Sequence, residues 1–303
     1  MVERARGPAP LRAGDWEVVM GKYVIVAESG SDITAAIAER YGIQVVPMHV
    51  QIGTETIDDG GMPGAEMYAR CKELGVMPRT SGAMPNDFAP VFERIRREQP
   101  DATILYLAYS AATTCSFESA QIASRDHDGN IIFIDTQNVA AGQLTILVRT
   151  AQWLEQHPDA TAEQVIEFVE DLKKRVLMAF IPGDLGYLKA GGRLSNGAFV
   201  GATLLRIKPV IELIDGRLIA TEKLRGSMQK AIFTLIDHLM YKGAMDTSHA
   251  YLIRSSGLSQ ELQGRIEVRL GELGFECVEW VDTNNVISSH CGPGSFGIVL
   301  VKE

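Results

Sequence analysis

Short runs of apolar residues alternate with polar loops and helical patterns along the first half of the chain. The first run, at residues 23–27, leads into a polar loop, and an apolar face with helical spacing follows at residues 33–41. A second apolar run at residues 43–50 completes the order strand, turn, helix, strand. This order predicts the start of a parallel α/β unit.

The same alternation continues to about residue 178. Apolar runs at residues 102–108 and 131–134 predict buried strands, and helical spacing marks the segments around them. Thr161, followed three residues later by Gln164, forms a capping-box pattern that starts one of these helices. The expected helices cover residues 62–74, 88–97, 143–156 and 162–174, and residues 78–85 are expected to form a loop.

Beyond residue 178 the pattern changes to a hairpin followed by mixed elements. Strand-like runs at residues 208–213 and 218–223 flank Asp215 and Gly216, a strong two-residue turn signal. The remaining pattern predicts helices at residues 227–241 and 260–273, and strands at residues 250–254, 276–281 and 297–301. The fold class is therefore α/β, with a parallel-sheet domain at residues 22–178 and a mixed-sheet domain at residues 179–303.

Composition agrees with a folded chain that has a sizeable core. Of 303 residues, 46% are hydrophobic and 22% are charged, which excludes a collagen-like, disordered or disulfide-stapled chain as a whole. With 29 Lys and Arg against 38 Asp and Glu, the net charge is −9. An acidic chain does not suit nucleic acid or an anionic membrane surface, because both need concentrated cations.

Two segments bear on cellular location. Residues 1–21 carry three arginines and no continuous apolar stretch, so we expect a flexible extension rather than a secretory signal. The longest apolar candidate, residues 197–214, is interrupted by Arg206 and Lys208, so no membrane span is expected. The four cysteines have no zinc-site spacing and predict reduced thiols, hence a cytoplasmic protein without a metal: Cys71, Cys115, Cys277 and Cys291.

Several polar loops follow apolar strands, at residues 28–32, 110–116 and 135–138. Loops at the carboxyl ends of parallel strands converge on a binding crevice. Their hydroxyls and backbone N–H groups suit a carboxylate or phosphate, but they also suit helix caps, and composition leaves both interpretations open. The loop at residues 78–82, with Thr80 and Ser81, is equally open between an anion site and a turn.

Two later motifs are sharper. Gly191 and Gly192 would let the backbone approach a ligand, and Arg193 would supply a planar cation for a carboxylate, unless the segment is only a turn. No nucleotide-binding glycine motif is present, so a nucleotide is not expected. His290 precedes a Gly-Pro-Gly turn and is a candidate functional histidine. Asp58 and Asp59 are adjacent and face opposite ways along a strand, which indicates a solvated turn.

In their order and spacing, these motifs are similar to those of the DegV family of bacterial fatty-acid-binding proteins, which are FakB-like subunits of the bacterial fatty acid kinase system. The resemblance covers roughly residues 22–303. The matching segments are E-S-G-S-D-I at residues 28–33, V-P-M-H-V at 46–50, D-G at 59–60, T-S-G-A-M at 80–84, T-C-S-F-E-S-A at 114–120, D-T at 135–136, L-K-A-G-G-R-L-S at 188–195, I-K-P-V-I at 207–211 and H-C-G-P-G at 290–294.

This resemblance implies a two-domain, DegV-like protein that binds a long-chain fatty acid in a buried tunnel and needs no other cofactor. It implies that the carboxylate is held by Thr80, Ser81, Thr114, Arg193 and His290, with supporting loops at Ser29, Cys115, Asp135, Gly191 and Gly192. Such a protein is not itself an enzyme. It presents its ligand to a separate fatty acid kinase, which makes an acyl phosphate for phospholipid synthesis. Arg225 is implied as a kinase contact, and we expect a monomer.

Two departures from the family pattern lie near the implied head group. Thr114 and Cys115 replace the usual Ser-Gly, and residues 82–84 are Gly-Ala-Met instead of Gln-Pro-Ser. Either change could shift lipid preference or remove lipid binding. Two alternative functions therefore stay open: an acyl ester hydrolase, with Thr114 or Ser81 as nucleophile and His290 as base, and a regulatory module that binds another small carboxylate.

Overall fold

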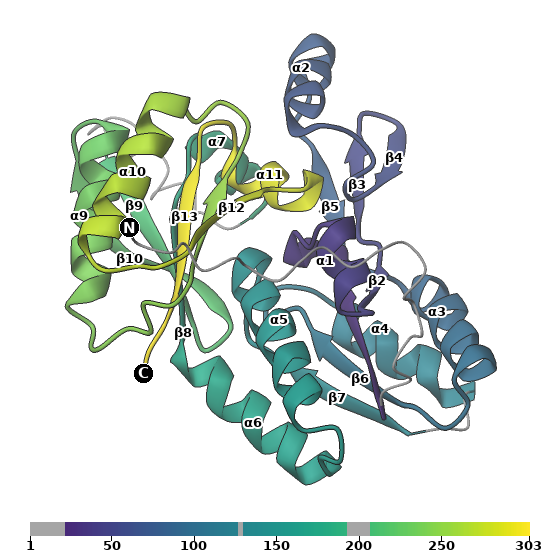
Figure 1. Ribbon diagram of the computed structural model, residues 1–303. Helices are drawn as coiled ribbons and strands as arrows, with labels where there is room; N and C mark the ends of the chain where they lie inside the picture. The colour runs from purple at the N-terminus through teal and green to yellow at the C-terminus, as the bar shows by residue number, and fades with distance from the viewer. Residues whose placement is uncertain (1–21, 127–129, 193–206) are drawn as a thin grey trace, which may run out of the picture.

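The computed structural model describes residues 22–126, 130–192 and 207–303. These residues form a four-stranded parallel sheet in the order β2-β1-β6-β7, a six-stranded mixed sheet in the order β10-β9-β8-β13-β11-β12, and a small sheet in the order β4-β3-β5. Figure 1 shows the two larger sheets side by side, with helices covering each. The predicted α/β class is confirmed, with a parallel sheet in the N-terminal part and a mixed sheet in the C-terminal part.

The parallel sheet is buried on both faces, which is why its strands are continuous apolar runs. Val26 and Tyr106 point to the layer of α3 and α4, while Ile25 and Leu105 point to the layer of α5. Alternation along each strand thus builds two separate cores. The elements are β1 (Tyr23–Glu28), β2 (Gln44–Val46), β6 (Thr103–Ala108), β7 (Ile131–Asp135), α1 (Ala35–Arg40), α3 (Pro85–Glu98), α4 (Ser116–Ala123), α5 (Ala140–Gln156) and α6 (Ala162–Arg175), with 3-10 turns η1 (Ser29–Ser31) and η2 (Ser124–Asp126).

The small sheet corrects two expectations. Residues 43–50 were expected as one strand but form β2 and the start of β3, because Pro47 has no N–H to donate to a ladder. The expected loop at residues 78–85 contains strand β5, which pairs with β3. Figure 1 shows this sheet with α2 above the parallel sheet and beside α11. Its elements are β3 (His49–Ile52), β4 (Glu55–Asp58), β5 (Arg79–Ser81) and α2 (Gly64–Leu74).

The mixed sheet begins with β8, and its predicted hairpin is confirmed. Asp215 and Gly216 both have positive φ, as a tight hairpin turn requires. Leu235, Leu252 and Ile298 belong to the core beneath α9 and α10. The elements are β8 (Val176–Ile181), β9 (Ile207–Ile214), β10 (Arg217–Arg225), β11 (Ala250–Arg254), β12 (Val278–Asp282), β13 (Phe296–Val301), α7 (Leu185–Ala190), α9 (Met228–Met240), α10 (Gln260–Glu272) and α11 (Asn285–Cys291).

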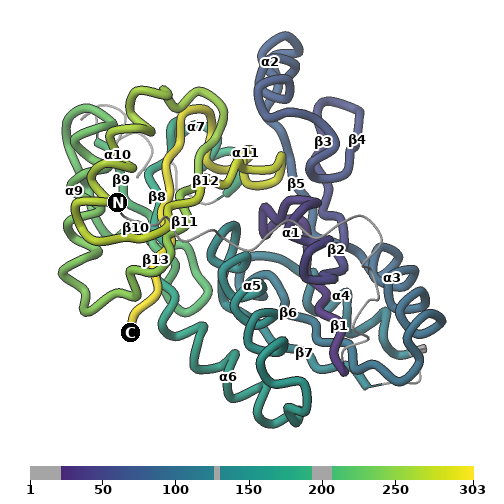
Figure 2. The backbone as a smooth tube through the Cα atoms, in the orientation of Figure 1, coloured from purple at the N-terminus to yellow at the C-terminus, as the bar shows by residue number. Residues whose placement is uncertain are grey.

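The position of the domain division stays a prediction. The expected boundary after residue 178 falls inside β8, whose strand ladder begins at Val176. Figure 2 shows the chain leaving α6 and entering β8 directly, so no loop separates the last helix before the mixed sheet from the first strand of that sheet. In the described ranges, no helix is both long enough and apolar enough to cross a membrane.

Candidate functional site

A cavity of about 300 Å³ lies where the three sheets meet. Its wall is mostly apolar and takes residues from both halves of the chain. None of the described lining residues is Asp, Glu, Lys or Arg. The lining residues are Met48, Thr80, Ser81, Gly82, Tyr109, Thr113, Thr114, Cys115, Val139, Ala140, Met178, Phe180, Leu218, Ile253, Thr283, Val286, Ile287, His290, Cys291, Ser295, Phe296 and Gly297.

Two predicted binding residues meet directly in this wall. Thr80 lies in β5, and His290 lies in the last turn of α11. The Oγ1 atom of Thr80 is 3.0 Å from the Nε2 atom of His290. A hydroxyl and an imidazole in contact can together donate to and accept from one carboxylate. The structure thus joins the two halves of the chain at the polar part of the cavity.

Thr114, on the loop after β6, lines the same cavity. Its Oγ1 atom is 3.0 Å from Oγ of Ser116, and Ser116 Oγ accepts a hydrogen bond from the backbone N–H of Ala83. Gly82 has no room for a side chain, since an added Cβ would lie 2.2 Å from Oγ1 of Thr114. The two segments that depart from the family pattern are therefore packed against each other.

Ser81 and Cys115, both exposed, line the same cavity. Ser81 follows Thr80 on β5 and is paired with His49 in the neighbouring strand. Cys115 is the N-cap residue of α4. Asp135 supports this region from the end of β7, where its Oδ1 atom accepts hydrogen bonds from the backbone N–H groups of Ala111 and Gln137.

The glycine motif contacts the site through its first glycine. A Cβ added to Gly191 would lie 2.1 Å from Nδ1 of His290, whereas one added to Gly192 would contact none of the described residues within 4 Å. The absence of a side chain at Gly191 therefore leaves the space that the His290 imidazole occupies. Arg193, the predicted cation, lies outside the described residues. Arg225 is exposed at the end of β10 and does not line the cavity.

Asp59 corrects the expectation of a solvated turn. Asp58 is exposed, but the Asp59 carboxylate accepts hydrogen bonds from Ser29 Oγ at 2.9 Å and from the backbone N–H of Val286 at 2.7 Å. Burial raises the pKa of Asp59 from 3.8 to about 6, against the lowering effect of these hydrogen bonds. Ser29, predicted as a supporting residue, thus acts through Asp59 rather than at the cavity wall.

All four cysteines are unpaired, and Cys71 and Cys291 are buried. Burial raises the pKa of the Cys291 thiol to about 12, so this thiol stays protonated near neutral pH and is a poor nucleophile. The hydroxyl in contact with His290 is that of Thr80, while the Thr114 hydroxyl is bonded to Ser116. The hydrolase hypothesis requires the hydroxyl of Thr114 or Ser81, as the nucleophile, to contact His290, as the base. The observed arrangement differs from this requirement.

Sequence reasoning did not find the apolar part of the wall. Phe180, Leu218 and Phe296 lie on three strands of the mixed sheet and line the cavity. In the sequence they look like ordinary core residues, and no local signal separates the two roles. Ser116 was detectable, because it lies inside the T-C-S motif that singled out Thr114.

Comparison with known proteins agrees with this fold. A family model described as "Uncharacterised protein, DegV family" matches residues 22–303. The chain is 28% identical over 299 residues to a fatty acid-binding protein of Thermotoga maritima, which covers 93% of this chain and 99% of that protein.

Two solved structures are close in fold. One is a DegV family protein from Thermus thermophilus described for fatty acid binding, with a TM-score of 0.81, 26% identity, and coverage of 93% of this chain and 99% of that one. The other is the Streptococcus pneumoniae fatty acid kinase B3 protein loaded with linoleic acid, with a TM-score of 0.78, 19% identity and the same coverage. The Thermotoga maritima protein and both of these structures are described by the fatty acid that they bind.

Gly191→Ala is expected to displace the His290 imidazole, because the new methyl group would overlap its Nδ1 atom. Gly192→Ala is the matched control. The added methyl group meets none of the described residues, but the φ of 73° at Gly192 makes alanine cost about 1 kcal/mol of stability. The nitrogen shifts of the His290 ring, measured by NMR, should change in the first variant and not in the second. Equal spectra in both variants would contradict the packing described.

Stability should depend on the titration of Asp59. A raised carboxyl pKa means that the folded state binds this proton more tightly than the unfolded chain, so the associated stability is present below about pH 4 and is lost as the pH rises through about 6. Between about pH 4 and pH 6 the wild type should lose on the order of 3 kcal/mol of folding stability through Asp59, and Asp59→Asn should not show this loss. Urea unfolding at several pH values tests this.

Glu28 and Asp32, whose pKa values are also raised by burial, titrate in both proteins, so the difference between the two pH curves reports Asp59 together with the like charge that it adds near Asp32. Asp171→Asn, at an exposed pair with Arg175, is the control for net charge. Parallel pH curves for the wild type and Asp59→Asn would show that the carboxyl is not buried as described.

Proposed function

Because the chain belongs to the DegV family, we propose that it binds a long-chain fatty acid in the cavity and presents the carboxylate to a fatty acid kinase for acyl phosphate formation. The observation that carries the proposal is the composition of the cavity wall. Hydroxyls and one imidazole form the polar part of the wall, and apolar strand residues form much of the remainder. This combination suits a single polar head group with an apolar tail.

Hydroxyls and the imidazole are suited to the carboxylate. A buried carboxylate is costly unless hydrogen bonds satisfy its oxygens. Thr80, Thr114 and His290 provide such groups, and Arg193 is proposed, from the family resemblance, as the compensating cation. Ser81 and Cys115 complete the proposed surroundings of the head group, with Cys115 adding volume where the family has glycine.

The apolar wall is suited to the tail. Each methylene removed from water contributes about 0.8 kcal/mol, so about ten of them contribute about 8 kcal/mol before ordering costs. Met178, Phe180, Leu218 and Phe296 provide this surface. The described cavity, at about 300 Å³, is at the lower end of the range of ligand pockets. A short polar metabolite would leave most of this wall without a matching partner.

The second part of the proposal is that the protein presents its bound fatty acid to a kinase. It is supported by the family resemblance and by the fold shared with the fatty acid kinase B3 protein. Arg225 lies at the exposed end of β10, away from the cavity wall, and is the proposed docking residue. We further propose that the protein acts as a cytoplasmic monomer.

Purified protein is expected to carry fatty acid. Native mass spectrometry should show a mass increment that disappears after delipidation, and an organic extract should contain the matching acid. Thr80→Val should weaken rebinding about tenfold, since a hydrogen bond to a charged group contributes about 1.5–3 kcal/mol. Thr56→Val, at an exposed position on β4 of the same small sheet, is the control.

Three outcomes contradict this function. Delipidated protein that takes up no fatty acid of any length would exclude lipid binding. Turnover of acyl esters that is lost in His290→Ala would favour the hydrolase instead. Tighter binding of a short carboxylate than of any fatty acid would favour the regulatory alternative.

Arg225→Ala should leave fatty acid binding unchanged and reduce acyl phosphate formation with the cognate kinase. The reason is that Arg225 is exposed and remote from the cavity wall. Arg217→Ala, an exposed arginine at the other end of the same strand, is the matched control. The reaction is followed with labelled ATP. Equal rates for Arg225→Ala and wild type would remove Arg225 from the docking surface.

A further inference from the structure

Helix α11, which carries His290, is held by groups from the N-terminal half of the chain. Oδ1 of Asp32 accepts a hydrogen bond from the backbone N–H of Asn284 at 2.8 Å. Oδ1 of Asp59 accepts one from the backbone N–H of Val286 at 2.7 Å. The first N–H groups of a helix have no partner within the helix, so these carboxylates satisfy donors that would otherwise lack one.

The contact is reciprocal. Oδ1 of Asn285 accepts hydrogen bonds from the backbone N–H groups of Gly60 and Met62, and its Nδ2 group donates to the carbonyl of Met62. Further along α11, the Tyr68 hydroxyl donates to the carbonyl of Ser288 at 3.1 Å. The N-terminal half therefore holds the helix at its start and along its length. Figures 1 and 2 show α11 lying beside α2 and β5.

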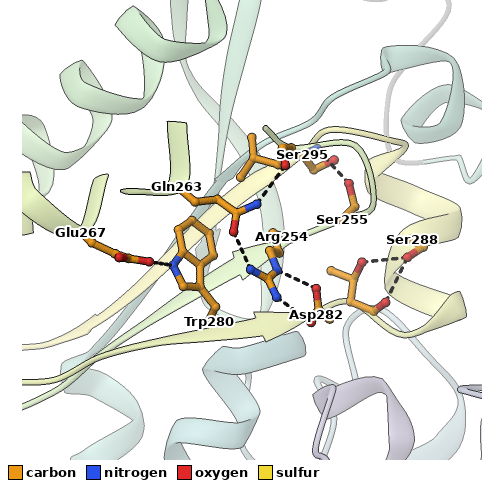
Figure 3. Close-up of polar contacts among 10 residues, drawn as sticks. Arg254, Ser255, Gln263, Glu267, Trp280, Asp282, Ser288 and Ser295 are labelled. Carbon is orange, nitrogen blue, oxygen red and sulfur yellow. Dashed lines mark hydrogen bonds and ion pairs between the residues drawn. The ribbon is translucent and has the colours of Figure 1, made fainter. Parts of the chain in front are cut away.

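The C-terminal half holds the other end of the helix. Ser255 Oγ donates to the carbonyl of Gly292 and accepts from the backbone N–H of Ser295. Ser288 Oγ is 2.7 Å from Oγ1 of Thr283 (Figure 3). The turn after the helix is thus fixed to its own sheet, and Thr283 bonds the segment before the helix to the same half, while the backbone N–H groups of Asn284 and Val286 at its start are bonded to carboxylates of the other half.

The two carboxylates are costly to keep at this joint. Oδ2 of Asp32 is buried, with no hydrogen-bond partner among the described residues. Asp59 and Asp282 add like charge near Asp32, and burial raises the pKa of Asp32 well above its usual range. Asp59 has its own pKa raised to about 6. Such a cost is typical of groups retained for function rather than for stability.

We propose that Asp59, with Asp32, is a positioning residue that fixes α11 and thereby places the imidazole of His290 against Thr80. The proposal rests on the proposed function, because His290 matters only if it contacts the head group. Helix α11 has seven residues, and His290 lies one turn after Val286. A shift of the backbone at Val286 therefore also shifts the imidazole of His290. Asp59 does not line the cavity, so its effect on the ligand passes through the helix.

The first measurement needs no ligand. The ring-nitrogen shifts of His290 are recorded by NMR on delipidated protein, and His290→Ala provides the assignment. Asp59→Ala should change these shifts because α11 loses its anchor. Asp59→Asn keeps the Oδ1 acceptor for Val286 and should restore shifts close to those of the wild type. Asp171→Ala, remote and exposed, is the control.

The second measurement is the affinity for oleic acid, followed by displacement of a fluorescent fatty acid. Asp59→Ala should weaken binding about tenfold, and Asp59→Asn by less than about twofold. In a double-mutant cycle with Thr80→Val, the losses should be strongly non-additive, because both changes break the same Thr80–His290 arrangement. A purely structural role of Asp59 would give additive losses.

These outcomes separate the two proposals. Unchanged His290 shifts in Asp59→Ala, or an additive cycle, would overturn the positioning role. Failure of the wild type to bind oleic or any other fatty acid would overturn the proposed function, while the ligand-free shifts would still test the positioning. If Asp59→Ala does not fold, Asp32→Ala removes the neighbouring anchor at Asn284 and is held to the same two criteria.

Discussion

The contact between Thr80 and His290 is the constraint on which the rest of the site depends. The two residues are 210 positions apart and meet at 3.0 Å, one on a strand of the small sheet and one on α11. For them to meet, β5 must lie beside α11, and the backbone at Gly191 must leave room for the imidazole. Much of the architecture around the cavity follows from holding these two side chains together.

At α11, the contact between the two halves combines apolar packing, in which Val286 shares a buried cluster with Val50 and Met67, with buried polar contacts. Hydrogen bonds are directional and fix geometry, whereas apolar packing tolerates sliding. Asp32 and Asp59 accept hydrogen bonds from backbone N–H groups at the start of α11, and the Asn285 side chain bonds to the backbone on the other side, so the helix is oriented through its main chain and through Asn285. Desolvation of the Asp32 and Asp59 carboxylates lowers the stability of the fold. In return, their hydrogen bonds to α11 fix the orientation of His290.

The sequence was informative wherever the determining interaction is local. Strand β1, the Thr161 cap and the Asp215-Gly216 hairpin depend on neighbouring residues, and all three are confirmed. Strand β5 was missed because its partner strand lies about thirty residues earlier. Helix α11 is short and without a clear apolar period, and it is ordered by contacts from the other half. Asp59 looked solvated for the same reason.

The candidate head-group residues were predicted from the family resemblance, and two segments near them depart from the family pattern. The structure shows how these two departures are related. An added Cβ at Gly82 would lie 2.2 Å from the Thr114 hydroxyl. A side chain at position 82 therefore requires a different placement of the side chain at position 114. The two departures from the family pattern are then coupled, and together they keep a hydroxyl in the cavity wall. This coupling supports an altered shape of the proposed head-group site rather than its loss.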